Sequence, residues 1–456
     1  MKLVVIGGGL SGLAAAYRLR RAGHDAIVLE AHHRVGGKIH SERAEGFLVE
    51  HGPNGFLSGR APILRLAREV GLGHRLCPAA TAAKKRYLYL NGALVALPSS
   101  PPAFLKSPIL SVRGRLRLLA EVFIRRRRGG DDESVFQFAR RRLGEEAANT
   151  LIDPMVTGIH AGDIRRLSLR AAFPRLHALE QAHGGLIRGM LALKRRGTAV
   201  GEGGPPGTLT SFPGGMSELI GGLVNAMAPN VVQAGRPVDR IEAQGRGWRV
   251  YAAGDAPIEA DGVVLATPTS VMARLLGPIA PAAVSPLTQI KYAPVGVVAL
   301  GYAAEDIARA FDGFGFLVPS HQTPRVLGVL WSSSIFAGRA PDGHVLLRAI
   351  IGGARHPELL TLDDGALIST IRAELSSTLG CPFPAPRFAR VVRWAEGIPQ
   401  YTLGHLARRR AVEEAARAHR GLFLAGNGLF GVSAPDCVAR ADALPGIVAN
   451  ALGAGD

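Results

Sequence analysis

Short apolar runs and glycine-rich turns alternate along the first forty residues of the chain. Residues 2–6 form an apolar run of strand length, and a run of glycines and small residues follows at 7–12. A stretch with a helical pattern then reaches Arg21, and a second apolar run covers 26–30. Strands that are buried on both faces are short and almost wholly apolar, so this order predicts a strand–helix–strand unit of a parallel sheet.

Further apolar runs predict that distant segments complete this domain. The strand-like runs lie at 231–232, 247–251, 262–268 and 421–427. The last run precedes a helix that extends to Leu452, and Pro435 stands near its first position, where a missing N–H is harmless. The sequence therefore predicts an α/β fold with a Rossmann-type domain built from three discontinuous segments, 1–75, 230–285 and 405–456.

Two regions of different pattern separate these segments. Residues 107–125 alternate apolar and basic positions at helical spacing, and Arg125 to Arg128 close the stretch. This pattern fits a helix on an anionic membrane surface, and it equally fits an amphipathic helix with a solvated basic face; both interpretations stay open. An exposed loop is expected at 194–210, and short strands alternating with turns at 285–400. The remaining predicted domains are a mixed-sheet substrate domain (76–98, 205–229 and 286–404) and a helical, membrane-association-like insertion (99–204).

The glycines of the first turn have the spacing of a dinucleotide-binding site. Gly7, Gly9 and Gly12 form the pattern G-x-G-x-x-G, and Glu30 ends the second predicted strand. The first glycine permits a tight turn, the second lets the backbone approach a pyrophosphate, and the third allows close packing of helix on strand. N–H groups at the helix start meet phosphates, and the acid accepts from ribose hydroxyls. The acid would repel a 2′-phosphate, which argues against NADP.

A second glycine turn follows Glu30 and favours FAD. Arg34, Gly36, Gly37 and Lys38 come within eight residues of that acid. Two more glycines and two cations suit a long dinucleotide held at its phosphates. The extension resembles the one found in the large superfamily of FAD-dependent oxidases and desaturases.

The amino-acid composition limits the classes of binding partner to be expected. The 456 residues contain 54 Lys plus Arg against 36 Asp plus Glu, a formal net charge of +18, which fits nucleic acid, an anionic membrane surface or acidic substrates. No nucleic-acid-binding signature is present, so we expect no nucleic-acid partner. Three widely separated cysteines and fourteen histidines without ligand spacing indicate neither a disulfide framework nor a metal site. No run of about eighteen apolar residues occurs, so we expect a cytoplasmic protein, peripheral on a membrane or not.

Several segments resemble the oxygen-dependent protoporphyrinogen oxidases, the FAD enzymes of late haem synthesis. The segments are 50–55 (EHGPNG), a hairpin at 84–98, a turn at 157–168, the strand 313–319 (GFGFLVP), and 393–405 with Arg393-Trp394, Pro399-Gln400-Tyr401 and Gly404-His405. The resemblance covers essentially the whole chain. It implies three hydride transfers from a porphyrinogen to FAD, with O₂ as acceptor and hydrogen peroxide as product. The cofactor supplies this chemistry, which agrees with a sequence that shows no convincing acid–base or nucleophile set.

The resemblance also implies site residues. Arg86 would hold a propionate, because a guanidinium forks onto a carboxylate. Phe314, Gly315, Leu317 and Ile350 would frame the flat macrocycle, and Gly158 and Ala161 would keep the opposite wall clear. The expected cofactor-binding residues are Gly7, Gly8, Gly9, Leu10, Ser11, Gly12, Glu30, Ala31, Arg34, Gly37, Lys38, Gly52, Pro53, Asn54, Gly55, Val238, Ala266, Trp394, Gly426, Asn427, Val432, Ser433 and Ala434.

Three of these residues depart from the pattern of the family. Lys38 stands where eukaryotic members often carry an aromatic residue, and Asn54 replaces an arginine found in some members. Ser433 stands where many relatives have glycine or alanine. A serine is small enough to fit there, and its hydroxyl is suited to cap the helix that follows.

Other functions remain as alternatives. A coproporphyrinogen III oxidase would use the same fold on a substrate with four propionates, and a wider, more cationic cavity would favour it. An amine oxidase or carotenoid desaturase, and a non-catalytic flavin-binding membrane protein, are the further candidates. The expected partners are a porphyrinogen, O₂, an anionic membrane surface and a second copy of the chain.

Overall fold

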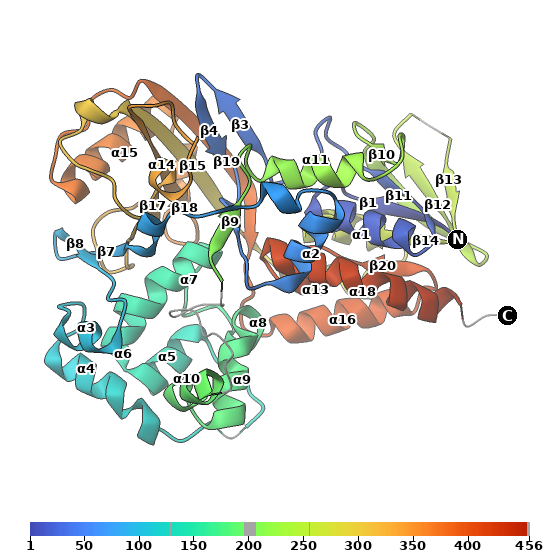
Figure 1. Cartoon of the computed structure of the whole chain (residues 1–456). Coiled ribbons are helices and arrows are strands. Elements are labelled where there is room, and N and C mark those ends of the chain that lie inside the picture. The colour runs from blue at the N-terminus through green and yellow to red at the C-terminus, as the bar shows by residue number, and fades with distance from the viewer. Residues whose placement is uncertain (128, 196–206, 255, 454–456) are drawn as a thin grey trace.

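A five-stranded parallel sheet forms the half of the molecule that carries both termini (Figure 1). The computed structural model describes residues 1–127, 129–195, 207–254 and 256–453. The strand order is β10 (Val232–Gln233), β2 (Asp25–Leu29), β1 (Lys2–Ile6), β14 (Gly262–Leu265) and β20 (Leu422–Leu424). The predicted strands near 231, 262 and 422 join this sheet, whereas the predicted strand at 247–251 lies in a separate antiparallel sheet.

Four helices cover one face of this sheet. They are α1 (Leu10–Arg21), α2 (Ala61–Glu69), α11 (Ser217–Asn225) and α18 (Ala434–Leu452). Their buried side chains share one core with β1 and β2, and that core includes Leu219 and Leu223 of α11. We expected residues 205–229 in the substrate domain, and α11 packs on α1 instead. Its apolar residues match the face of α1, a pairing that the local pattern does not reveal.

The other face of the five-stranded sheet is covered by a small antiparallel sheet and three helices. These elements are β11 (Val238–Gln244), β12 (Gly247–Ala252), β13 (Ile258–Ala260), α12 (Thr269–Leu276), α13 (Val284–Thr288) and α16 (His405–Arg417). Their side chains form a second core with Val4, Ile6 and Leu265. The parallel sheet is thus buried on both sides, which explains its nearly continuous apolar strands.

A seven-stranded mixed sheet forms the second half (Figure 1). Its order is β19 (Phe388–Pro399), β15 (Tyr292–Ala303), β18 (His344–Gly352), β17 (Gly328–Trp331), β16 (Gly315–Leu317), β7 (Arg86–Leu90) and β8 (Ala93–Ala96). Only the pair β16–β7 is parallel among the described pairs of this sheet. The predicted hairpin at 84–98 is confirmed, with its turn at Asn91 (φ 50°) and Gly92 (φ 87°).

The expectation of short strands and turns over 285–400 is wrong in two respects. The strands β15 and β19 are each twelve residues long, and a sixteen-residue helix, α15 (Asp364–Leu379), packs on the sheet. Shorter elements join the halves: β3 (Ser41–Ala44), β4 (Phe47–Glu50), β5 (Phe56–Leu57), β6 (Cys77–Pro78), β9 (Leu209–Ser211), α14 (Ser332–Ile335) and α17 (Asn427–Phe430).

The insertion, which lies between segments of these two halves along the chain, consists mainly of helices. They are α3 (Pro101–Lys106), α4 (Val112–Leu119), α5 (Val135–Leu143), α6 (Glu145–Ala147), α7 (Asp153–His160), α8 (Leu169–Ala172), α9 (Pro174–His183) and α10 (Leu186–Arg195). The predicted helix at 107–125 begins later, because Ser111 caps α4. A 3₁₀ turn, Ala120–Phe123, continues it. The predicted loop at 194–210 lies largely outside the described residues. None of the helices within the described ranges is long and apolar enough to cross a membrane.

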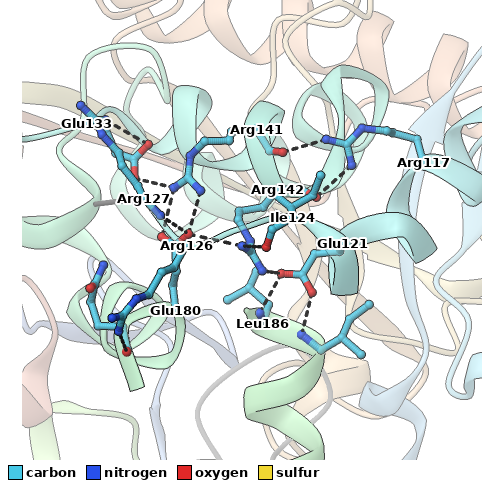
Figure 2. A network of polar contacts seen from close by, with 12 residues as sticks. Arg117, Glu121, Ile124, Arg126, Arg127, Glu133, Arg141, Arg142, Glu180 and Leu186 are labelled. Carbon is cyan, nitrogen blue, oxygen red and sulfur yellow. Dashed lines mark hydrogen bonds and ion pairs between the residues drawn. The ribbon is translucent and has the colours of Figure 1, made fainter. Parts of the chain in front are cut away.

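A buried ion-pair network holds the insertion together (Figure 2). Arg142 and Glu121 form an ion pair with no exposed side-chain surface, and Glu121 also accepts from the N–H groups of Leu186 (2.8 Å) and Ile187 (3.1 Å). Arg141 joins Glu180 at 2.7 Å and Glu133 at 2.8 Å. The network therefore ties the end of the α4 segment to α5, α9 and α10.

Candidate flavin and substrate site

The glycine loop between β1 and α1 has the geometry of a phosphate cradle. Gly7 has φ +108°, and a side chain there would meet the carbonyl of Ala266 at 2.8 Å. A side chain on Gly12 would overlap the Gly7 carbonyl. Space beside Gly9 is open, and Gly9 begins α1 without any side-chain cap. The first N–H groups of α1, which include those of Leu10 and Ser11, are thus presented to an anion.

Glu30 lies directly against this loop. Its carboxylate accepts from the N–H of Gly8 at 2.6 Å and from the N–H of His32 at 2.8 Å. A side chain on Gly8 would meet the Cβ of Glu30 at 2.8 Å. The acid at the end of β2 is therefore fixed beside the cradle, as the spacing predicted. Ala31 follows it on the surface.

The second glycine turn packs on the first. Gly36 (φ +103°) donates to the carbonyl of Gly8 at 2.7 Å, and Gly37 (φ +58°) lies against Gly9. Arg34 stabilises the turn by donating to the carbonyl of Gly37 at 2.9 Å. Lys38 is half-buried, and its Nζ lies 5.3 Å from the centre of the Tyr292 ring. Desolvation lowers the pKa of Lys38.

The loop 51–55 is held from the seven-stranded sheet. Trp394 of β19 donates from Nε1 to the carbonyl of His51 at 2.7 Å, and Arg348 of β18 donates to the carbonyl of Gly52. The α-carbon of Gly52 packs on the carbonyl of Lys38, where a side chain would overlap it. A buried donor of Asn54, Nδ2, has no partner in the described structure.

The C-terminal loop is fixed by a tyrosine. The Tyr401 hydroxyl donates to the carbonyl of Asn427 at 2.5 Å and accepts from the N–H of Gly431 at 2.7 Å. Ser433 caps α18 reciprocally with Asp436, so the predicted capping role is confirmed. The loop from Gly426 to Ala434 thereby has a defined path beside Ala266 and the first glycine turn.

These loops fit a dinucleotide with a flavin. Open space beside Gly9, the uncapped start of α1 and the adjacent Glu30 provide for the nucleotide part. The orphaned Nδ2 of Asn54 is a donor that a flavin carbonyl would satisfy. The side chain of Val238 is buried in the core with Ile6, and its expected role at the cofactor stays a prediction.

The residues expected to bind the substrate lie along one face and edge of the mixed sheet. Arg86 pairs with Gly315 across β7–β16, and its guanidinium lies 5.1 Å from the centre of the Phe314 ring. A side chain on Gly158 would approach Leu317 within 3.2 Å. Residues 157–160, expected as a turn, form the last turn of α7 instead, and Ala161 follows in the left-handed region (φ 47°).

The substrate and flavin residues share this face. Ala161 packs with Val295 and Leu327, and Ile350 packs against the same cluster. Val295 lies opposite Trp394 in the β15–β19 register, and Trp394 reaches the loop 51–55. Directly opposite residues of paired strands point to the same face. The structure thus brings the predicted substrate wall and a predicted flavin loop together.

Three functional candidates escaped the sequence analysis. Arg348 is a lone charge inside the apolar run of β18, and that interruption is the signal that could have exposed it. Tyr401 was noted only as part of a motif. Arg355 joins α7 to the mixed sheet, because it donates to Asp153 at 2.7 Å, to Thr157 at 2.6 Å and to the carbonyl of Val318 at 2.8 Å. No group of three or more potential metal ligands occurs among the described residues.

Comparison with known proteins shows the family of the chain. Residues 10–442 match the model of the flavin-containing amine oxidoreductases. The chain is 29% identical to a coproporphyrinogen III oxidase of Bacillus subtilis (strain 168), covering 96% of this chain and 95% of the relative. It is 32% identical to the chloroplastic protoporphyrinogen oxidase of Nicotiana tabacum, over 95% and 83% of the two chains.

A solved structure of similar fold supports the same family. A protein from Exiguobacterium sp. 255-15, assigned by its name to the protoporphyrinogen oxidases, superposes with a TM-score of 0.84 at 26% identity over 98% of both chains. Cyclohexylamine oxidase from Brevibacterium oxydans IH-35A shares the fold, with a TM-score of 0.74 at 18% identity. The chain belongs to the flavin-containing amine oxidoreductase family, and it is an FAD-dependent oxidoreductase.

Proposed function

We infer that this enzyme oxidises a porphyrinogen to a porphyrin in haem biosynthesis, with protoporphyrinogen IX as substrate, O₂ as electron acceptor and hydrogen peroxide as product. The observation that carries this proposal is that Arg86 and Leu317 of the mixed sheet lie beside Phe314 and Gly158, and that the same sheet also holds the predicted flavin loop 51–55. A cation at one end of an apolar wall suits a flat, carboxylate-bearing ring.

The chain's own contribution is binding and orientation. Bound FAD supplies hydride acceptance and reaction with O₂. Arg86 would fork onto a substrate propionate, and the ring of Phe314 beneath it limits the positions of the guanidinium. The missing side chain of Gly158 lets α7 pack closely on Leu317, since a Cβ there would approach that side chain within 3.2 Å.

The buried histidines do not supply an acid or a base in this scheme. Burial lowers the pKa of His160 to about 4 and that of His405 to about 3, so both are neutral at physiological pH. His405 stacks on Tyr401 with ring centres 3.8 Å apart. Their roles are therefore in packing, which agrees with chemistry that resides in the cofactor.

Coproporphyrinogen III is the second candidate substrate. Relatives that carry each of the two enzyme names match this chain over nearly its whole length at about the same identity, 29% and 32%. Lys84, Lys85 and Arg86 form a cationic stretch at the start of β7. Such a stretch favours a substrate with four propionates, and protoporphyrinogen IX has two.

Porphyrin fluorescence decides between these substrates. Purified holoenzyme is given each porphyrinogen in air, and hydrogen peroxide is measured in parallel. Faster turnover of protoporphyrinogen IX supports the proposal, and a clear preference for coproporphyrinogen III replaces it by the second candidate. Oxidation of neither by a protein with bound FAD would refute both.

Arg86→Ala tests the propionate contact. Loss of a charge-assisted hydrogen bond of about 1.5–3 kcal/mol predicts a rise in KM of roughly 10- to 100-fold with little change in kcat. The matched control is Lys85→Ala, because Lys85 is the neighbouring cation and already pairs with Asp312 at 2.5 Å. An equal rise in KM for both variants would contradict the assignment of Arg86.

We also propose that the exposed face of residues 105–126, which include α4 and its flanking turns, rests on an anionic membrane surface. Val112, Leu116 and Phe123 expose 66%, 63% and 82% of their surface, and Leu105 and Leu119 are exposed beside them. Arg113, Arg125 and Arg126 are exposed in the same segment. Apolar side chains rimmed by arginines match an interface that carries negative headgroups.

Vesicle sedimentation tests this membrane surface. Binding to vesicles with phosphatidylglycerol should exceed binding to pure phosphatidylcholine, and Phe123→Asp should weaken it about tenfold or more. Leu406→Asp, which changes an exposed leucine of α16, is the control. Equal binding of both variants would remove this surface from the proposal.

A further inference from the structure

One buried arginine of the mixed sheet lies beside the predicted flavin loop 51–55. Arg348 is 4% exposed, lies in the middle of β18, and donates to the carbonyl of Gly52. Trp394 holds the preceding carbonyl, that of His51. Two consecutive carbonyls of the loop are thus held by neighbouring parts of the same sheet.

The charge around Arg348 is not balanced. The nearby carboxylate of Glu50, 2% exposed, pairs with Arg339 at 3.3 Å and accepts from Ser41 (2.7 Å) and from the N–H of Met216 (2.9 Å). Within the described ranges Arg348 makes no ion pair, and its Nε has no partner. Glu50 is therefore the carboxylate that both buried guanidiniums face, while Glu218, which also acts on Arg339, is paired with Arg75.

Arg348 nevertheless stays charged. Burial lowers its pKa to about 10, which is still well above neutral pH. A buried cation without a counter-charge is unfavourable, and a negative charge that develops nearby relieves it. Hydride transfer produces such a charge in a flavin, because a hydride adds two electrons and one proton to a neutral ring.

We propose that Arg348 acts on the flavin through the loop 51–55, as a positioning residue that fixes Gly52 and as a buried positive charge that favours the reduced over the oxidised cofactor. The proposal rests on the FAD site and holds for either porphyrinogen. It also gives Asn54 a defined orientation, because Asn54 lies two residues after Gly52, whose carbonyl Arg348 holds.

Three variants separate charge from position. Arg348→Gln keeps a donor for Gly52 and removes the charge, Arg348→Lys keeps the charge, and Arg348→Met removes both. Midpoint potentials are measured on each holoenzyme by anaerobic equilibration with reference dyes, and FAD dissociation constants by titration of the apoprotein. Arg390→Gln is the control, since Arg390 is 41% exposed on β19 and pairs with Glu42.

The expected result is a lower potential for Arg348→Gln, by about tenfold in the two-electron equilibrium or about 30 mV. Arg348→Lys and Arg390→Gln should stay within twofold of the unchanged protein. Arg348→Met should lower the potential and also weaken FAD binding; if it does not fold, the glutamine variant decides alone.

Two results would overturn the proposal. One is an unchanged midpoint potential in Arg348→Gln with FAD bound. If KM alone rises in that variant, Arg348 is assigned to a substrate carboxylate instead. The other is a fall in Arg348→Lys as large as in Arg348→Gln, because the charge would then have no effect of its own. Loss of the porphyrinogen activity proposed above would leave both readouts intact.

Discussion

Two buried clusters of charge in this molecule differ in their balance. In the helical insertion, each of the carboxylates Glu121, Glu133 and Glu180 has at least one ion-pair partner among Arg127, Arg141 and Arg142 (Figure 2). Between β4 and the mixed sheet, one carboxylate, Glu50, faces the two guanidiniums of Arg339 and Arg348.

The difference indicates what each cluster is for. The balanced network is complete without a ligand, and it joins helices that also share a small apolar core around Phe138 and Leu186. The unbalanced cluster lies beside the flavin loop and has an excess positive charge that only a further negative group offsets. Balance thus points to structure, and imbalance points to a site that acts on a ligand.

Arg142→Met breaks the balanced network and should have the largest effect on stability. It leaves Glu121 and Glu180 buried with less positive charge, and breaking a buried pair in this way costs about 3–5 kcal/mol. Urea unfolding should show this loss. Arg140→Met on the same helix is the control, since Arg140 is 63% exposed and should cost less than about 0.5 kcal/mol. Equal losses would contradict the structural role of the network.

Lowering the pH should destabilise the insertion without mutation. His160, 1% exposed at the end of α7, has a pKa lowered by burial to about 4. The unfolded state binds a proton more readily, so the stability is complete above pH 6.5 and falls as the pH drops toward 4. By pH 5 the loss from this residue should be about 2 kcal/mol.

The control for this acid effect is His160→Gln. Unfolding free energies at pH 7.5 and pH 5 should differ less in the variant, by about the amount that His160 contributes. An unchanged pH dependence would show that other groups account for the acid sensitivity.

Sequence alone predicted the features that depend on local pattern. The strand, glycine turn, helix and acid of residues 2–30 follow one another without a gap, so spacing defined them, and Ser433 was recognised as a cap from its place before Pro435. The helix α15 was missed although Leu367, Ile371, Leu375 and Leu379 repeat at helical spacing and are all buried. Its signal was present but masked by the strand-rich surroundings.

Other features depend on contacts between distant segments. Neither the packing of α11 on α1 nor the parallel pairing of β16 with β7 has a local signal. The same holds for Arg348, whose partner Gly52 lies 296 residues away, and for the balance of charge around it. The clusters compared above could therefore be recognised only in the folded chain.

Tyr401→Phe tests how the C-terminal loop is held. The backbone carbonyl of Tyr401 accepts from Ser168 of the insertion at 2.8 Å, and its hydroxyl bridges Asn427 and Gly431 in the C-terminal loop. Removing the hydroxyl leaves a buried donor and acceptor unpaired, at about 1–3 kcal/mol. Titration of the apoprotein should show FAD binding weakened by roughly tenfold. Unchanged affinity would mean that the loop holds its path without Tyr401.

Arg348→Met should have the smallest effect on stability, and this contrast with Arg142→Met is the sharpest test of the comparison. The variant loses the hydrogen bond to Gly52, which costs about 1 kcal/mol, but it also removes the desolvation cost of a buried cation that has no ion-pair partner. The two terms oppose each other, so the free energy of unfolding of the apoprotein should change by less than about 1 kcal/mol. A loss as large as that of Arg142→Met would show that Glu50 depends on both arginines, and the cluster would then be structural in the same sense as the network of the insertion. A small loss together with a lowered flavin potential would mean that the excess charge is held for the cofactor.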